Sequence, residues 1–189
     1  MGYICETIVT TMSDDGKVHI APLGLIARDD KWIIAPFRPS STLNNLEVVP
    51  FAVANHIDDV RVYAGCLTGR KDWAHGRAKK VKGAVLDGCV SHWELAVVDV
   101  EEDETRPRFV CEIVREKSHR AWAGMNRAQA AVLEAAVLIS RLKMLPREKI
   151  ESELKYLEIA ISKTAGPCEQ EAWGWLMEKV DVWRSSLDT

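Results

Sequence analysis

Residues 36–46 place hydroxyl side chains where a strand ends and a helix begins. Ser40, Ser41 and Thr42 stand at the expected helix start, and Arg38 precedes them. The open backbone N–H groups and the dipole of a helix start favour an anion. Hydroxyl and guanidinium groups also donate hydrogen bonds to phosphate oxygens. This pattern predicts a phosphate site, and the alternative is a plain helix N-cap beside a surface arginine.

A proline and a glycine interrupt the segment 19–24, which otherwise alternates like a strand. Pro22 and Gly24 flank Leu23 and weaken the hydrogen-bond ladder. Such positions mark either a bulge or a close approach of the backbone to a ligand. The segment therefore fits a flat aromatic ligand lying against it, and it equally fits a barrel corner that needs a kink.

His92 and Glu94 share one face of an expected strand, while Trp93 between them points to the opposite face. A histidine beside a carboxylate is suited to acid–base work. The interpretation favoured by the sequence is a hydrogen-bonded pair at the surface, with Trp93 covering a ligand or the core.

The cysteines show no metal-binding or disulfide pattern. They are odd in number, widely spaced and without a C-x-x-C pair: Cys5, Cys66, Cys89, Cys111 and Cys168. Small buried thiols are the expected outcome, with no zinc site and no disulfide framework. His19 and His56 lie on different expected strands, and two histidines without a third ligand are poor evidence for a metal.

Basic and aromatic residues interleave in the segment 69–80. This composition suits an anionic cosubstrate such as a nicotinamide nucleotide, or a single nucleic-acid strand. The interpretation we favour is a solvated surface loop.

Turn and periodicity signals divide the chain into strands and then helices. The expected strands are 3–12, 17–27, 32–35, 51–56, 90–101 and 106–116. The expected helices are a short one ending at residue 48, then 59–67, 126–144, one from 146 and one from 167, with 69–88 as a loop. Six antiparallel strands with short turns favour a small closed barrel, because an open sheet leaves edges to protect. The fold class is thus mainly β within α+β: a barrel over 1–117 and a three-helix extension over 118–189 that we expect to pack on the barrel.

The last two helices each carry one apolar stripe. The stripes are Ile150, Leu154, Leu157 and Ile161 on the first, and Ala172, Leu176, Val180 and Trp183 on the second. The helix 126–144 is apolar around most of its circumference. Such faces predict helices that pack on one another.

Composition excludes several classes of protein. The chain has 189 residues, of which 47% are hydrophobic and 28% charged, so a disordered chain is excluded. The net charge of −3 argues against a non-specific nucleic-acid binder. No apolar run is long enough to span a bilayer, and no secretory signal is visible. We therefore expect a cytoplasmic protein with no nucleic-acid and no membrane partner.

Three motifs together resemble the FMN-binding split-barrel proteins, which include flavin reductases and pyridoxamine-phosphate-oxidase-like proteins. They are Ala21-Pro22-Leu23-Gly24, then Ser40-Ser41-Thr42 with Asn45-Leu46, and Ala54-Asn55-His56. The likeness is greatest to an uncharacterised, mainly archaeal group with a C-terminal helical extension. It implies a split barrel that forms a homodimer, with one FMN at each side of the interface.

The resemblance also assigns cofactor contacts by motif position. The residues are Thr10, Pro22, Leu23, Gly24, Arg38, Ser40, Ser41, Thr42, Asn45 and Asn55. Lys163 is a further candidate outside these motifs, because in a dimer it could reach the flavin site. It implies that the hydroxyls and Arg38 hold the phosphate, supported by Asn45. Thr10 and the segment 22–24 would meet the isoalloxazine, and Asn55 would lie near the ribityl chain. Lys163 stands at a helix end, where the dipole explains it equally well.

One departure concerns charge. Flavin reductases often carry Lys-Asp-Thr where this chain has Ser40-Ser41-Thr42, so one positive charge is moved or lost. Arg38 is the candidate to replace it.

The function expected from the resemblance is an FMN-dependent oxidoreductase. Electrons or hydride would pass through FMN from a reduced nicotinamide, or another donor, to an unknown acceptor. No side chain is singled out as a catalytic acid or base. Two alternatives remain open: a non-enzymatic FMN carrier, and a barrel that binds another planar ligand such as a pterin.

Overall fold

An Asp-Gly turn folds the first two strands onto each other. Gly16 adopts a φ of +87°, which glycine tolerates without strain, and its N–H donates to the carbonyl of Ser13. The computed structural model describes residues 2–187, and the flanking strands pair in register from Ile4↔Ile26 to Met12↔Val18. The hairpin predicted here is confirmed.

The strands are β1 (Ile4–Met12), β2 (Val18–Arg28), β3 (Lys31–Ile34), β4 (Phe51–His56), β5 (His75–Arg77), β6 (Ala84–Leu86), β7 (Ser91–Glu101) and β8 (Arg108–Ser118). The helices are α1 (Ser41–Val48), α2 (Arg61–Leu67), α3 (Arg127–Ile139), α4 (Arg147–Thr164) and α5 (Pro167–Leu187). They form two compact units: Met1–Ile57 with Trp73–Trp122, and Asp58–Asp72 with Ala123–Thr189.

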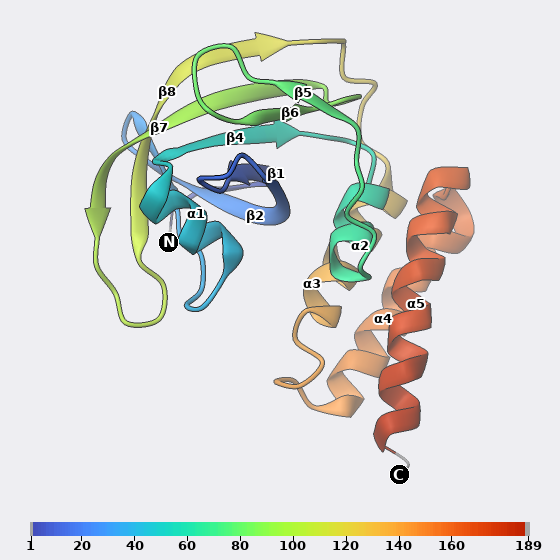
Figure 1. The fold of residues 1–189 in the computed structure, drawn as a ribbon. Helices are drawn as coiled ribbons and strands as arrows, with labels where there is room; N and C mark the ends of the chain where they lie inside the picture. The colour runs from blue at the N-terminus through green and yellow to red at the C-terminus, as the bar shows by residue number, and fades with distance from the viewer. Residues whose placement is uncertain (1, 188–189) are drawn as a thin grey trace. The chain divides into compact units, whose positions relative to one another are not determined.

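The first unit is a closed barrel of six antiparallel strands, in the order β1-β2-β3-β8-β7-β4, with β4 pairing back onto β1 (Figure 1). The predicted α+β class and six-stranded barrel are confirmed. The barrel interior is apolar because alternate residues of each strand point inward, including Val9, Leu25 and Leu95. Helix α1 adds Leu43 and Leu46 to the same core.

The predicted surface loop at 69–88 is wrong for residues 75–86. β5 and β6 pair as a two-stranded sheet, and Val81, Ala84 and Leu86 are buried. Each strand has only three residues and β5 is exposed. A segment that short has too few alternations to be distinguished from a loop by periodicity. We call residues 75–86 the hairpin segment.

The second unit is built from α2, α3, α4 and α5. Its core contains the predicted stripe residues: Ile150, Leu154, Ala172, Leu176 and Val180 are buried, while Leu157, Ile161 and Trp183 pack against them. Among the residues described, no helix combines the length and the apolar character needed to cross a bilayer.

Helix α3 ends at Ile139, five residues before the predicted end at 144. The N–H groups of Arg141 and Met144 bond three residues back, to Leu138 and Arg141, so the chain tightens into turns. Pro146 then begins the approach to α4.

One ion pair joins the two longest helices. Arg184 Nε lies 2.9 Å from Glu151 Oε1, and hydrogen bonding to Arg184 lowers the pKa of the Glu151 carboxyl. Arg184→Gln is expected to lower the free energy of unfolding by less than about 1 kcal/mol, because the pair is partly exposed. Protonation of Glu151 breaks the pair, so the difference should be lost as the pH falls through the folded pKa of Glu151, which lies below the ordinary value of a glutamate. Denaturant unfolding of both proteins at several pH values measures this.

Candidate functional site

The start of α1 presents hydrogen-bond donors. The Ser40 side chain accepts from the Leu43 N–H at 3.3 Å, and the Ser40 carbonyl accepts from the Asn44 N–H. The first four N–H groups of a helix have no partner within it, so those of Ser41 and Thr42 remain as open donors. Within residues 2–187, neither of these two hydroxyls makes a hydrogen bond. The predicted N-cap is confirmed, and hydroxyl and amide donors stand together beside it.

Asn45 fixes this helix on the barrel. Its side-chain amide donates to Thr11 Oγ1 at 3.0 Å, and both residues are buried. Helix α1 packs against β1 and β2. The structure therefore places the predicted phosphate residues and the β2 segment on neighbouring elements.

Arg38 is held by carboxylates. Its guanidinium lies 3.3 Å from Glu47 and 3.0 Å from Glu102, and its Nε donates to the Asp103 carbonyl at 3.5 Å. The guanidinium of Arg38, which the sequence analysis assigned to a phosphate, thus forms ion pairs with two acidic side chains.

The middle of β2 has one unpaired edge. β3 covers only Ile26–Arg28, so in the part of the chain that the structure describes, residues 21–25 pair with β1 alone. Packing within the protein already accounts for a glycine at position 24, because a Cβ there would lie 2.5 Å from Cγ2 of Ile4. The free edge is the feature that suits a flat ligand with polar groups along its rim.

Thr10 and Asn55 face a different neighbour. Thr10 Oγ1 donates to the Ala84 carbonyl at 2.5 Å. The Asn55 amide nitrogen donates to the carbonyls of Ile8 and Val53, and its oxygen accepts the Leu86 N–H at 2.8 Å. Adjacent strand residues point to opposite faces, so Thr11 meets α1 while Thr10 meets the hairpin segment. The structure therefore does not bring Thr10 and Asn55 to the start of α1.

Lys163 lies in the last turn of α4, in the helical unit. Its position beside the C-terminal end of a helix suits the dipole. Its cofactor role stays a prediction.

A cavity of about 400 Å³ opens beneath the hairpin segment, within the barrel unit. Its lining includes five lysine and arginine residues among Gly76, Arg77, Lys79, Val85, Leu86, Asp87, Gly88, Cys89, His92, Glu94, Arg115, Lys117, His119 and Arg120. We call it the hairpin cavity. None of the residues that the sequence assigned to a cofactor lines it.

The His92–Glu94 pair is buried in this cavity's wall, so the predicted surface location is wrong. His92 is 3% exposed and Glu94 is 0% exposed, and Nε2 of His92 lies 3.4 Å from Oε1 of Glu94. The hairpin segment covers both residues, and periodicity along one strand does not reveal such a cover. The expected opposite orientation of Trp93 is confirmed, since its ring packs against the barrel core.

Glu94 is held by backbone amides. Its carboxylate accepts the N–H groups of Lys79 at 3.0 Å, Lys80 at 2.5 Å and Val81 at 3.1 Å. Arg115 lies 3.3 Å away. Burial by itself raises the pKa of the Glu94 carboxyl, but the three amide bonds outweigh it and lower that pKa, so the group is ionised.

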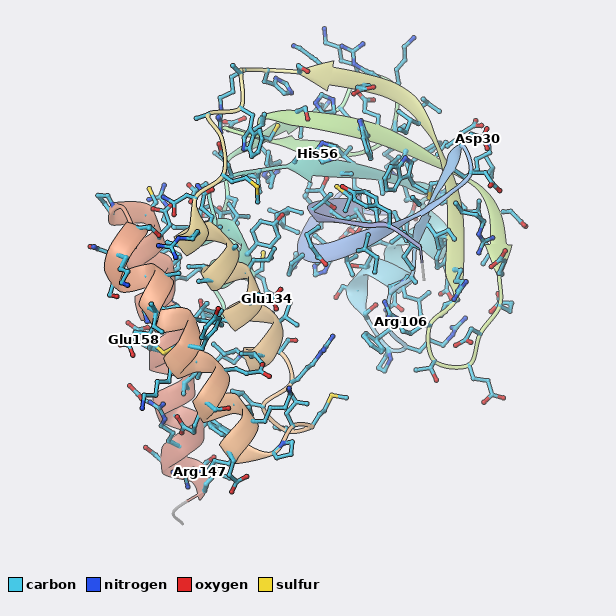
Figure 2. All side chains as sticks on the ribbon, turned by 180° about the vertical axis from the view of Figure 1, so that it is seen from behind. Asp30, His56, Arg106, Glu134, Arg147 and Glu158 are labelled. Carbon is cyan, nitrogen blue, oxygen red and sulfur yellow. The ribbon has the colours of Figure 1, made fainter. Side chains whose placement is uncertain are left out.

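Two histidines of this part of the barrel, His92 in the cavity wall and His56 outside it, have a pKa below the ordinary value for histidine. Burial lowers the pKa of His92, and the adjacent His119 adds to the effect. His56, labelled in Figure 2, ends β4 and donates or accepts through Nδ1 at 3.0 Å from Ser91 Oγ. Its ring lies edge-on to Trp93, with centroids 4.4 Å apart, so it belongs to the aromatic packing.

The sequence matches the family described as "Protein of unknown function (DUF447) N-terminal domain" over residues 5–120. This chain belongs to the DUF447 family. The description "Protein of unknown function (DUF447)" also matches residues 126–178. No curated protein matches the sequence.

Solved structures share the fold. An FMN-bound DUF447 protein from Methanosarcina mazei is 18% identical, with a TM-score of 0.81 over 95% of this chain and 96% of that one. The 2-nitrobenzoate 2-nitroreductase of Pseudomonas fluorescens is 17% identical, with a TM-score of 0.53 over 63% of this chain and 66% of its own. An FMN-binding protein from Thermus thermophilus is 15% identical, with a TM-score of 0.51 over 61% of this chain and 71% of its own. The resemblance to FMN-binding split barrels is confirmed for the fold.

The hairpin cavity is what sequence reasoning missed. Two local signals pointed to it: the Cys-x-x-His spacing of Cys89 and His92, and an acidic residue, Glu94, inside an apolar strand. His119 carries no signal of its own, because its place beside His92 depends on how β7 pairs with β8.

Proposed function

We propose that this DUF447 protein binds FMN and passes electrons or hydride through it to an acceptor. The observation that carries the proposal is the juxtaposition of open donors at the start of α1 with the unpaired edge of β2. FMN has the two matching parts: a phosphate, and a flat ring with polar atoms along one rim. The FMN-bound relative of the same family supports the choice of ligand.

In this proposal Ser41 and Thr42 hold the phosphate through their hydroxyl and backbone N–H groups, aided by the helix dipole. The backbone edge of residues 21–25 meets the ring's polar rim and orients it. The Ala27 N–H bonds Tyr3 beside β1, and backbone groups alternate along a strand, so residues 22 and 24 face the free edge. Gly24 supplies an N–H group there, whereas Pro22 supplies only a carbonyl. Bound FMN supplies the redox chemistry, and the chain supplies binding and orientation.

The test compares FMN with riboflavin, which lacks the phosphate. The wild-type protein should bind FMN more tightly than riboflavin. The double variant Ser41→Ala, Thr42→Val should lose at least about tenfold in FMN affinity, equivalent to about 1.4 kcal/mol, with little change for riboflavin. Thr42→Val keeps the buried shape while removing the hydroxyl. Flavin fluorescence titration gives all four dissociation constants.

Ser152→Ala is the matched control, because that hydroxyl sits on α4 and bonds only the Lys149 carbonyl. It should leave both affinities unchanged. Equal losses for FMN and riboflavin in the double variant would contradict the phosphate assignment. Failure of the wild-type protein to bind either flavin would overturn the proposal itself.

Three further parts of the proposal concern partners and place. We propose a reduced nicotinamide nucleotide as electron donor, a homodimer as the working form and the cytoplasm as the location. Exposed apolar side chains on β7 and β8 support the dimer: Val98, Val100 and Val114. Light scattering of the FMN-loaded protein tests the dimer, and anaerobic mixing with NADH or NADPH, followed by flavin absorbance, tests the donor. If neither nucleotide lowered the flavin absorbance, the result would favour a non-enzymatic FMN carrier.

A further inference from the structure

We propose that Cys89, His92 and His119 form a binding site for one divalent transition-metal ion such as Zn²⁺, at the wall of the hairpin cavity. Their ligand atoms all lie within 4.8 Å of one another. A thiolate and two imidazoles are the donors that Zn²⁺ prefers, and three protein ligands with one open position is a common zinc arrangement.

The two histidines already face each other through ring nitrogens. Nδ1 of His92 lies 2.7 Å from Nε2 of His119, and the rings stack with centroids 5.0 Å apart. Tetrahedral coordination at ordinary zinc distances places donor atoms about 3.3–3.7 Å apart. An ion would therefore replace the direct His92–His119 contact with only a small parting of these nitrogens. His119 is the exposed member of the three, so its side chain is the one with room to move.

Local backbone structure brings the three donors together. Gly88, at a φ of +77°, turns the chain after β6, so Cys89 lies beside the start of β7. The pairing of β7 with β8 then carries His119 to this place, and its N–H donates to the Val90 carbonyl at 2.8 Å. Two residues three apart and a third that directly follows β8 thus converge on one point.

Glu94 completes the arrangement typical of histidine ligands. With Nδ1 of His92 directed at the ion, the opposite nitrogen, Nε2, faces Oε1 of Glu94 at 3.4 Å. A carboxylate on the second ring nitrogen fixes the tautomer and raises the basicity of the ligating one. Glu94 is itself held by three backbone amides, so His92 has a rigid support.

The charges that line the cavity determine which further ligand a bound ion would take. The basic side chains of the lining, among them Lys117 and Arg120, oppose a bare cation, but they are exposed and screened by solvent. Negative charge comes from the thiolate, from Glu94 and from Asp87, which also lines the cavity. An ion here keeps a fourth position open toward the cavity, where the basic wall favours water or a small anion as the last ligand.

The experiment measures metal directly and does not depend on flavin. Full-length protein is stripped with a chelator, dialysed, and titrated with Zn²⁺ by calorimetry and with Co²⁺ by absorption spectroscopy. We expect one ion per chain, a thiolate-to-cobalt charge-transfer band, and tetrahedral d–d bands that Zn²⁺ abolishes. Mg²⁺ should produce no heat, because it prefers oxygen ligands.

Variants decide whether these residues are the ligands. Cys89→Ser should remove the charge-transfer band, and His119→Ala should weaken Zn²⁺ binding at least about 100-fold, beyond what loss of an outer partner costs. His119 is exposed, so its removal leaves the core intact and the test remains valid if Cys89→Ser folds poorly.

His75→Ala and Cys66→Ser are the matched controls, because neither residue lines the cavity. Both should keep wild-type metal binding. Stoichiometric zinc binding that survives His119→Ala, or no zinc binding by the wild-type protein, would overturn the proposal.

Discussion

Replacing Glu94 with alanine is expected to lower the free energy of unfolding by about 3–5 kcal/mol, the range for removing one partner of a buried ionic group. The physical reason is the loss of one acceptor shared by three backbone N–H groups, those of Lys79, Lys80 and Val81. A buried N–H group without a partner costs about 1–3 kcal/mol. This cost is smaller where a water molecule enters and accepts the hydrogen bond. Arg115 also loses its carboxylate.

The isosteric variant Glu94→Gln separates charge from volume. Its side chain keeps one oxygen, but its NH₂ group must face backbone donors or the Arg115 guanidinium. We therefore expect a loss of about 2–3 kcal/mol, smaller than for alanine but well above a surface substitution. Urea unfolding measures both variants.

Hydrogen exchange localises the effect. The amides of residues 79–81 should exchange faster in both variants, because Glu94 is their acceptor. Glu104→Ala, in the exposed turn between β7 and β8, is the control and should shift stability by less than about 0.5 kcal/mol. Glu94→Ala within about 1 kcal/mol of wild type would show that the hairpin segment does not depend on this carboxylate.

Replacing Asn55 with alanine is expected to cost about 2–3 kcal/mol of stability, through lost hydrogen bonds and a small cavity. The Leu86 N–H loses its acceptor, and the carbonyls of Ile8 and Val53 lose a donor. Asn44→Ala is the control, because Asn44 is exposed on α1. Thermal or urea unfolding of the three proteins gives the comparison.

The same variant tests the role that the family resemblance implied for Asn55. Its amide is committed to the hairpin segment, so FMN affinity of the folded variant should stay within about threefold of wild type, below 1 kcal/mol. A loss of tenfold or more at a temperature where the variant is fully folded would instead place Asn55 against the cofactor. Fluorescence titration well below the unfolding transition distinguishes the two.

Glu94, Asn55 and Thr10 share one structural task. They lie on the neighbouring strands β7, β4 and β1, and each bonds the backbone of the hairpin segment. A small second layer is thereby fixed over one wall of the barrel. The hairpin backbone satisfies polar atoms of all three side chains, which explains why each is buried without being apolar.

The sequence by itself determined the elements whose cause is local. The Asp15-Gly16 turn, the cap at Ser40 and the apolar stripes of α4 and α5 all depend on residues close in the chain. Strand alternation and short turns were enough to predict a six-stranded antiparallel barrel, since few closed arrangements satisfy them. The predicted cofactor group at the start of α1 rests on the same kind of local signal.

Only the tertiary structure decided what depends on contacts across the barrel. The hairpin segment is too short to have its own periodicity, and it is held by side chains from three strands elsewhere in the sequence. His119 meets His92 because the register of β7 and β8 places them together, 27 residues apart in the chain. Strand register, and which segment covers a given face, depend on the assembled sheet. A periodic pattern in the sequence indicates only which residues share a face of one strand.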